Sequence, residues 1–284
     1  MRLDGRREST HVDDRRGRGR VAGGLGIGGI LIAGLIYLLT GQQVDPDLLN
    51  GLVPSAGTTE MEFSPEEQEL AGFAKKILAG TEDVWSAYFS ANGLGDYRDP
   101  TMVLYTGTTS SGCGTGSASM GPFYCSADEC LYLDLSFFTS MKSQLGADGD
   151  FAYAYVIAHE VGHHVENLLG VLGQAHQQMA KMNKTDANRM SVRIELFADF
   201  LAGVWARHDD DTYGSLEPGD IEEAIRCASV IGDDYLQKKA QGYAVEESFT
   251  HGTAQQRAKW LNAGLKTGDI QEGLKIFQLN YSQL

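Results

Sequence analysis

The chain is poor in basic residues. Its 284 residues include 23 Lys and Arg against 38 Asp and Glu, which gives a formal net charge of −15. Residues 1–20 hold seven Arg and four acidic residues, or 7 − 4 = +3, so the remainder carries −15 − 3 = −18. A region this acidic repels phosphate groups. The composition therefore argues against nucleic acid as a partner and disfavours anionic surfaces.

An apolar run near the amino terminus lacks a cleavage site for signal peptidase. Residues 21–40 (VAGGLGIGGILIAGLIYLLT) carry no charge, and at about 1.5 Å per residue they match the roughly 30 Å of a bilayer core. No small-x-small pattern follows in LLTGQQV, so an uncleaved transmembrane helix is predicted in preference to a removed signal peptide. Arginines directly before the run favour a cytoplasmic amino terminus.

These features divide the chain into four parts. Residues 1–20 are expected to be a basic cytoplasmic tail, residues 21–40 a single membrane-spanning helix, and residues 41–63 a flexible linker. Residues 64–284 are expected to form one domain outside the cytoplasm, in the periplasm or at the cell exterior. The chain is 42% hydrophobic, which suits a single sizeable core over this length.

The strongest chemical signal is the string His159-Glu160-Val161-Gly162-His163. Residues four apart lie on one face of a helix, and residues 151–169 have a helical pattern that stops at Gly170. The two histidines can therefore bind one zinc ion, while Glu160 takes the proton of a water that attacks a carbonyl. A plain core helix is the alternative, but two histidines at ligand spacing around a glutamate favour zinc.

The sequence lacks the third histidine of the pattern HExxHxxGxxH, because Glu166 replaces its glycine and a leucine replaces its histidine. Glu166 also lies about 10 Å along the helix from His159, too far to share the ion. The apolar helix predicted over 188–208 carries Glu195 and Asp199, which would be costly to bury unpaired. We predict Glu195 as the third zinc ligand and Asp199 as the acceptor for a ligand histidine's other ring N–H.

Several motifs together resemble one known family. HEVGHH, VRIELFADFLAGVW, SFTHGTAQQR, GPFYC and YLDLSFF are similar to motifs of the bacterial neutral zinc metallopeptidases, a group of YpfJ-like membrane-anchored proteins. The similarity extends from about residue 64 to residue 266. It implies a zincin-like fold, zinc bound by His159, His163 and Glu195, Glu160 as the general base, and Asp199 behind a ligand.

Four cysteines in a predicted oxidising compartment allow three disulfide pairings. Cys113 and Cys125 bracket a glycine-rich turn and match positions shared with the family. The resemblance therefore implies a Cys113–Cys125 bond and leaves Cys130 to pair with Cys227. Free buried thiols are the alternative.

His251 is a further polar candidate. Thr253 and Gln256 form a capping-box pattern, which places His251 directly before the start of a helix. From there its ring could donate a hydrogen bond to the oxyanion that develops on the attacked carbonyl. A loop histidine that only orders the turn is the alternative, and Tyr124 and Tyr155 are weaker candidates for the same role.

The order of the predicted elements indicates an α+β fold that is mostly helical. A helix over 64–92, capped by Ser64 and ended by Gly93, precedes three short strands, the metal-binding helix and further helices. The strands are expected to form a small antiparallel sheet from residues 102–106, 123–125 and 131–135. The later helices are expected over 174–182, 220–230, 254–266 and 270–277.

The sequence thus predicts a membrane-anchored, zinc-dependent endopeptidase that cleaves proteins of the cell envelope. The peptide substrate would lie extended along the edge of the small sheet. The alternative is a non-catalytic, zinc-stabilised module that binds envelope partners. The intact Glu160 favours the enzyme, because a structural zinc site needs no base and usually closes its fourth position with another ligand.

Overall fold

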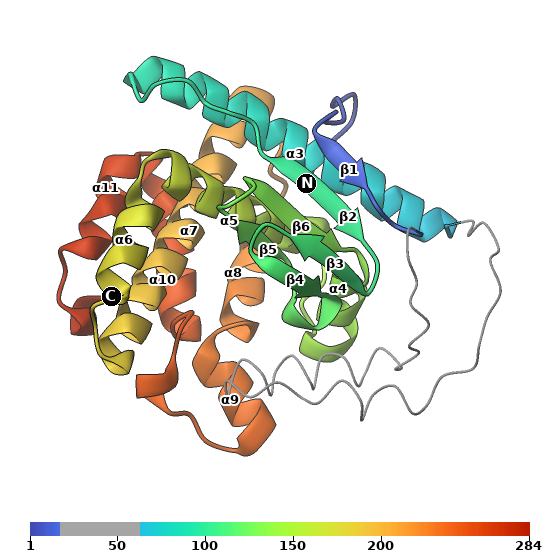
Figure 1. Cartoon of the computed structure of the whole chain (residues 1–284). Coiled ribbons are helices and arrows are strands. Elements are labelled where there is room, and N and C mark those ends of the chain that lie inside the picture. Colours follow the sequence, from blue (N-terminus) through green and yellow to red (C-terminus); the bar gives the residue numbers. More distant parts are fainter. Residues whose placement is uncertain (18–62) are drawn as a thin grey trace.

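In the computed structural model, which describes residues 1–17 and 63–284, helix α3 (Pro65–Asn92) begins and ends as predicted. Ser64 accepts the backbone N–H of Glu67, and Gly93 ends the helix in the left-handed conformation. Its buried face includes Ile77, Trp85 and Phe89, which join the main core. The helix runs along one side of the molecule and contacts the helix that carries the HExxH string (Figure 1).

Four short strands form a mixed sheet, and the prediction of an antiparallel sheet is wrong. The strand order is β1-β2-β6-β5, with β1, β2 and β6 parallel and β5 antiparallel at the edge. After β2 the chain forms a separate hairpin and rejoins the sheet as the edge strand β5, and the turn that follows brings β6 back in the direction of β2. The strands are β1 (Val12–Asp14), β2 (Thr101–Tyr105), β5 (Phe123–Cys125) and β6 (Cys130–Asp134).

The two faces of this sheet belong to different cores, because side chains alternate along a strand. Met102 and Leu133 are among the residues that pack with the helices, whereas Val103, Tyr105 and Tyr132 form a smaller cluster on the other face. The hairpin, β3 (Thr108–Ser111) and β4 (Gly114–Ser117), lies against this second face through the contact of β4 with Phe123.

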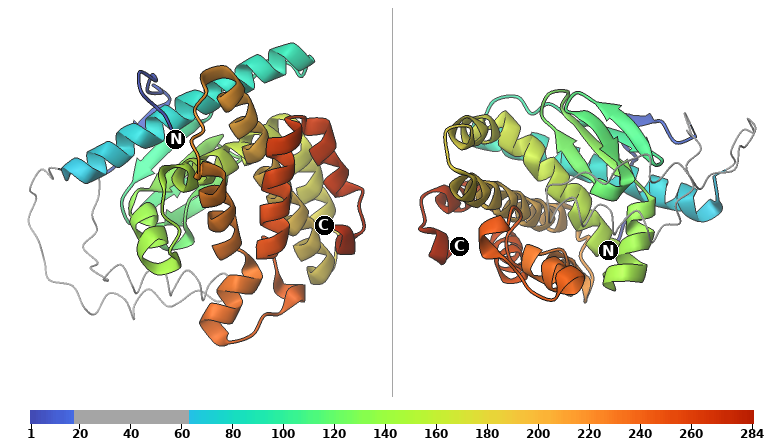
Figure 2. Two further views of the ribbon diagram at one scale, coloured as in Figure 1. Left: turned by 180° about the vertical axis from the view of Figure 1, so that it is seen from behind. Right: turned by 60° about the horizontal axis from the view of Figure 1, so that its bottom comes forward.

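Helices fill the other side of the molecule. Helix α5 (Asp150–Leu168), which carries the HExxH string, contacts the edge strand β5, and it also packs against α7 (Lys184–Tyr213) and α8 (Asp220–Val230). Helix α10 (Ala254–Thr267) packs on α7 and α8 (Figure 2). The remaining α-helices of the described residues are α4 (Ser136–Ser140), α6 (Val171–Met179), α9 (Asp233–Gln241) and α11 (Ile270–Leu274). This mostly helical α+β arrangement confirms the predicted class.

Helices α7 and α10 approach each other at two glycines. A Cβ atom on Gly264 would lie 1.9 Å from the carbonyl oxygen of Phe200, and one on Gly203 would lie 2.2 Å from that of Leu261. Any larger residue would push the helices apart. This close contact brings α10, and with it Arg257, against the helix that carries Glu195.

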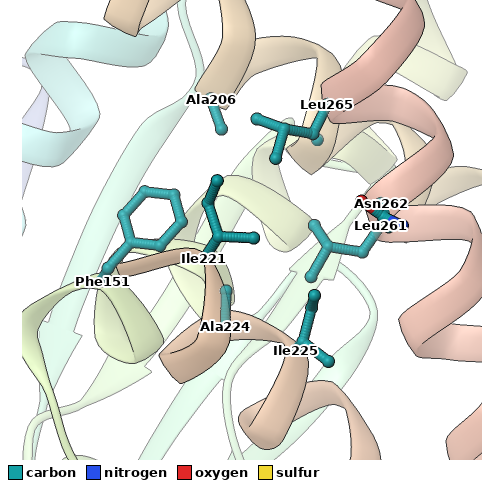
Figure 3. Close-up of a pocket in the computed structure, with 9 residues that line it drawn as sticks. Phe151, Ala206, Ile221, Ala224, Ile225, Leu261, Asn262 and Leu265 are labelled. Carbon is teal, nitrogen blue, oxygen red and sulfur yellow. The ribbon is translucent and has the colours of Figure 1, made fainter. Parts of the chain in front are cut away.

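The core beside this contact leaves little free volume. Figure 3 shows an apolar pocket of about 10 Å³ between α5, α7, α8 and α10, which has room for about one water molecule. A pocket of this size and lining offers no site for a peptide. Its labelled apolar side chains are Phe151, Ala206, Ile221, Ala224, Ile225, Leu261 and Leu265.

Residues 1–17 belong to the folded body, which corrects the prediction of a separate cytoplasmic tail. Val12 pairs with Met102 in the sheet, and the Arg6 Nη2 atom lies 2.7 Å from Asp209 Oδ1. Segments that share a sheet lie on the same side of a membrane. The arginines that favoured a cytoplasmic tail include Arg16, which is buried and paired with Asp14 in this structure.

The predicted membrane helix over 21–40 lies outside the described residues, as does the linker over 41–63 except for its last residue. Within residues 1–17 and 63–284, no helix combines the length and apolar character that crossing a bilayer requires.

One of the two expected disulfides is present. Cys113 and Cys125 are bonded, which ties the β3–β4 hairpin to the edge strand. Cys130 and Cys227 are free thiols, so the second pairing is wrong. Cys227 is buried in the helical core, whereas Cys130 packs with the cluster on the opposite face of the sheet, and the two cannot meet.

The pairing of Arg6 with Asp209 yields a test of the position of the amino-terminal segment. We expect Arg6→Ala and Asp209→Ala to destabilise the full chain, because each substitution leaves the other residue's charge nearly buried and without its partner. A double-mutant cycle, measured by thermal unfolding, should give a coupling free energy of about 0.5–3 kcal/mol. Strictly additive costs would contradict the packing of residues 1–17 against the domain.

Candidate metal centre

The backbones of α5 and α7 approach each other at Gly162. A Cβ atom at this position would lie 2.9 Å from the carbonyl oxygen of Ala198. The glycine within the HExxH string is therefore required for the close packing of α5 on α7. Because the helices meet here, Glu195 and Asp199, which flank Ala198 on α7, reach the histidines of α5.

The three predicted ligands come together at one point. The Nε2 atom of His159 lies 3.2 Å from Glu195 Oε2, and that of His163 lies 3.7 Å from Glu195 Oε1. Tetrahedral zinc with bonds of about 2.0–2.1 Å places its ligand atoms about 3.3 Å apart. The trio thus has the donor atoms and the spacing that zinc requires, and it leaves the fourth coordination position to water or substrate.

Among the described residues, one other group has three ligand atoms close together: Asp150, Asp220 and Glu223. That group contains carboxylates alone, which suit hard cations such as calcium or magnesium. The group of His159, His163 and Glu195 contains the imidazoles that zinc prefers. The chemistry of the donors therefore favours the histidine group as the zinc centre.

Asp199 holds His159 from behind. Its Oδ1 atom lies 2.8 Å from the Nδ1 atom of His159 and also accepts the hydroxyl of Tyr155. Arg257 donates to both oxygens of this carboxylate, at 2.8 and 2.9 Å. Burial opposes ionisation of Asp199, but Arg257 and His159 outweigh it and hold its pKa well below the usual range. His159 is thereby oriented with Nε2 toward Glu195.

His163 has a carboxylate of its own. Its Nδ1 atom lies 2.9 Å from the Oε2 atom of Glu166, which is one turn further along α5 and fully buried. Burial raises the pKa of Glu166 to about 7. Glu166 faces the ring nitrogen opposite to the one near Glu195, which agrees with the expectation that it is not a ligand.

Glu160, the predicted general base, lies beside the three predicted ligands. Only 8% of the residue is exposed, and its charge interacts with His159, His163 and Glu195. Burial raises the pKa of Glu160, and the two histidines partly offset this effect. A carboxylate with a raised pKa beside the metal ligands is suited to take a proton from water near neutral pH.

His251 also belongs to this neighbourhood. Asp233, the first residue of α9, lies 3.2 Å from the His251 Nδ1 atom and accepts the backbone N–H groups of Thr250, His251 and Gly252. Burial lowers the pKa of His251, but Glu195 and Asp233 outweigh this and raise it. The raised pKa favours the protonated imidazole, which is a stronger hydrogen-bond donor than the neutral ring.

The two tyrosines that were weaker candidates are already engaged. The hydroxyl of Tyr124 lies 2.9 Å from the Nδ1 atom of the buried His164, and that of Tyr155 donates to Asp199. His164 also contacts the carbonyl of Arg98 through its other ring nitrogen. Burial lowers the pKa of His164, which favours the neutral ring. Its contact with Tyr124 connects α5 to strand β5 of the sheet.

Sequence reasoning missed the roles of Arg257, Asp233 and Glu166. A signal existed for Arg257, because two acidic residues in an apolar helix call for a nearby cation, and this arginine ends the motif SFTHGTAQQR. Asp233 and Glu166 carried no such signal. The role of Asp233 depends on the loop before α10 folding back on α9. The role of Glu166 depends on the side-chain rotamer that it adopts within α5.

Two histidines that flank a glutamate on one helix, with a carboxylate from a neighbouring helix as the third ligand, form the centre of an HExxH metallopeptidase. Comparison with known proteins agrees. Residues 1–274 match the family described as "Putative neutral zinc metallopeptidase". The chain is 47% identical over 278 residues to the Escherichia coli protein YpfJ, covering 95% of this chain and 96% of that protein.

A Mycobacterium tuberculosis protein, Rv2575, is 43% identical over 186 residues, which covers 62% of each chain. No solved structure matches the chain. Because the family match spans nearly the whole sequence, the chain belongs to this family of zinc metallopeptidases.

The ligand arrangement predicts how the protein handles metal. The purified protein should hold about one zinc per chain, and Glu195→Ala should lose most of it because two histidines alone bind zinc weakly. Metal analysis after dialysis measures both. Glu69→Ala, at an exposed position on α3, is the matched control and should keep its zinc. Full retention of zinc by Glu195→Ala would reassign the third ligand.

Proposed function

We propose that this protein is a zinc-dependent endopeptidase in which His159, His163 and Glu195 hold the metal. The observation that carries this proposal is the nearly buried Glu160 beside a cluster of three possible ligands, one fewer than the four that tetrahedral zinc takes. When bound, zinc supplies a Lewis acid that polarises the scissile carbonyl and lowers the pKa of water.

The side chains around this centre have separate roles: one transfers protons, one stabilises the oxyanion and the others orient histidines. Glu160 accepts the proton of the attacking water and returns it to the leaving nitrogen of the cleaved peptide bond. His251 donates a hydrogen bond to the oxyanion that forms on the carbonyl. Asp233 keeps the imidazole of His251 oriented through its contact with Nδ1. Asp199 and Glu166 hold the rings of the two ligand histidines in place.

We further propose that the substrate extends along β5, as in zincin-like enzymes. This strand is at the edge of the sheet and contacts α5. Its Tyr124 is linked to His164, the residue directly after the second ligand, so the strand is fixed relative to the metal centre. The open edge of a strand offers backbone N–H and C=O groups to an extended peptide.

Membrane attachment through residues 21–40 and a position in the periplasm or at the cell exterior are also proposals. The apolar composition of the run supports the first, and the Cys113–Cys125 disulfide supports an oxidising compartment. A single crossing would separate residues 1–17 from the sheet that they share with Met102, so the proposal is attachment to one face of the membrane, with residues 1–17 and the domain on the same side and proteins of the cell envelope as the substrates. The coupling of Arg6 to Asp209 tests the shared location.

The roles of Glu160 and His251 lead to different kinetic outcomes. Glu160→Gln should bind zinc normally and lose about 10²–10⁴-fold in peptide hydrolysis, because the base is removed. His251→Ala should keep its zinc and lose about 10–10³-fold if it stabilises the oxyanion. Cleavage of denatured casein by the full chain, with new amino termini mapped, provides the measurement.

The control for this experiment is Glu69→Gln, which should cleave at the wild-type rate. Equal cleavage by wild type and Glu160→Gln, or none by either, would contradict the enzyme and favour a zinc-stabilised binding module. Loss of activity in Glu160→Gln with full activity in His251→Ala would keep the enzyme and assign the histidine to ordering its turn.

A further inference from the structure

Each of the two histidines of the proposed metal centre contacts a buried carboxylate through its Nδ1 atom, but the two carboxylates have very different partners. Asp199, behind His159, accepts two hydrogen bonds from Arg257 and one from Tyr155. The guanidinium balances its negative charge within hydrogen-bonding distance. Asp199 therefore aligns His159 while it contributes little net charge to the centre.

Glu166, behind His163, has no such balance. The residue is 0% exposed, and one oxygen contacts His163 while the other, Oε1, has no hydrogen-bond partner among the described residues. Its charged partner within the described residues is His163, a ligand of the proposed centre. Within the described residues, no Lys or Arg side chain forms an ion pair with Glu166.

A buried carboxylate without a cation is costly unless a nearby positive charge offsets it. A divalent cation on the far side of the His163 ring would provide that charge, because the imidazole transmits the interaction from metal to carboxylate. Glu166 sits three residues after His163, and side chains at this spacing meet on one helix face. The geometry therefore couples the carboxylate to the metal and to little else.

We propose that Glu166 is the positioning residue of the metal centre whose uncompensated charge strengthens metal binding through His163, whereas Asp199 serves mainly to align His159 and to hold the helices together. This inference rests on the proposed zinc site. It assigns separate tasks to two carboxylates that contact ligand histidines in the same way.

The experiment compares Glu166→Gln with Asp199→Asn in the full chain. Glutamine still accepts a hydrogen bond from His163 but carries no charge. We expect zinc affinity, measured by competition with a chelator, to fall about 10–100-fold in Glu166→Gln. The thermal unfolding midpoint of the metal-free variant should stay close to that of the wild type. Asp199→Asn should lower the metal-free midpoint, because it leaves Arg257 buried beside a neutral partner.

Asn167→Ala is the matched control on the same helix. Its side chain contacts the Tyr124 hydroxyl and not His163, so zinc affinity should not change. Unchanged affinity in Glu166→Gln would overturn the proposal. So would a metal-free midpoint that falls as far as in Asp199→Asn, or a variant that does not fold, because both indicate a structural role. If the wild type itself binds no zinc, the proposed zinc site fails, which is distinguishable from either result.

Discussion

The carboxylate of Asp199 is the contact on which the rest of the site depends. It is completely buried, and it joins three helices: α7, which carries it, α5 through His159 and Tyr155, and α10 through Arg257. Loss of Arg257 would leave the buried charge of Asp199 without its cation, which typically costs several kcal/mol. The same interaction that orients a metal ligand thus also fixes the relative positions of the helices that form the centre.

Glycines at the helix contacts allow the backbones to come close enough for this arrangement. Gly162 lets the backbones of α5 and α7 approach, and Gly203 with Gly264 does the same for α7 and α10. Short side chains at these contacts allow the carboxylates of α7 to reach imidazoles on one side and a guanidinium on the other. The proposed metal centre therefore depends on close helix packing, which also places the proposed base Glu160, nearly buried on α5, beside it.

Sequence reasoning succeeded where the chemistry is local. The spacing of His159 and His163 fixes a shared helix face, and Glu195 and Asp199 stood out as acids in an apolar helix. It failed where the outcome depends on distant contacts. Nothing in residues 1–17 predicted that Val12 would pair with Met102, since the arginines nearby also suit a membrane-flanking tail. The separation of Cys130 from Cys227 likewise follows from which face of the sheet each core occupies.

The central claim is that a zinc ion is held between α5 and α7 by His159, His163 and Glu195. Anomalous X-ray diffraction from crystals of the full chain, recorded on both sides of the zinc absorption edge, tests it most directly. The account predicts one strong anomalous peak within about 2.0–2.2 Å of both Nε2 atoms and of a Glu195 oxygen. A peak at Asp150, Asp220 and Glu223, or no peak between the two helices, would contradict it.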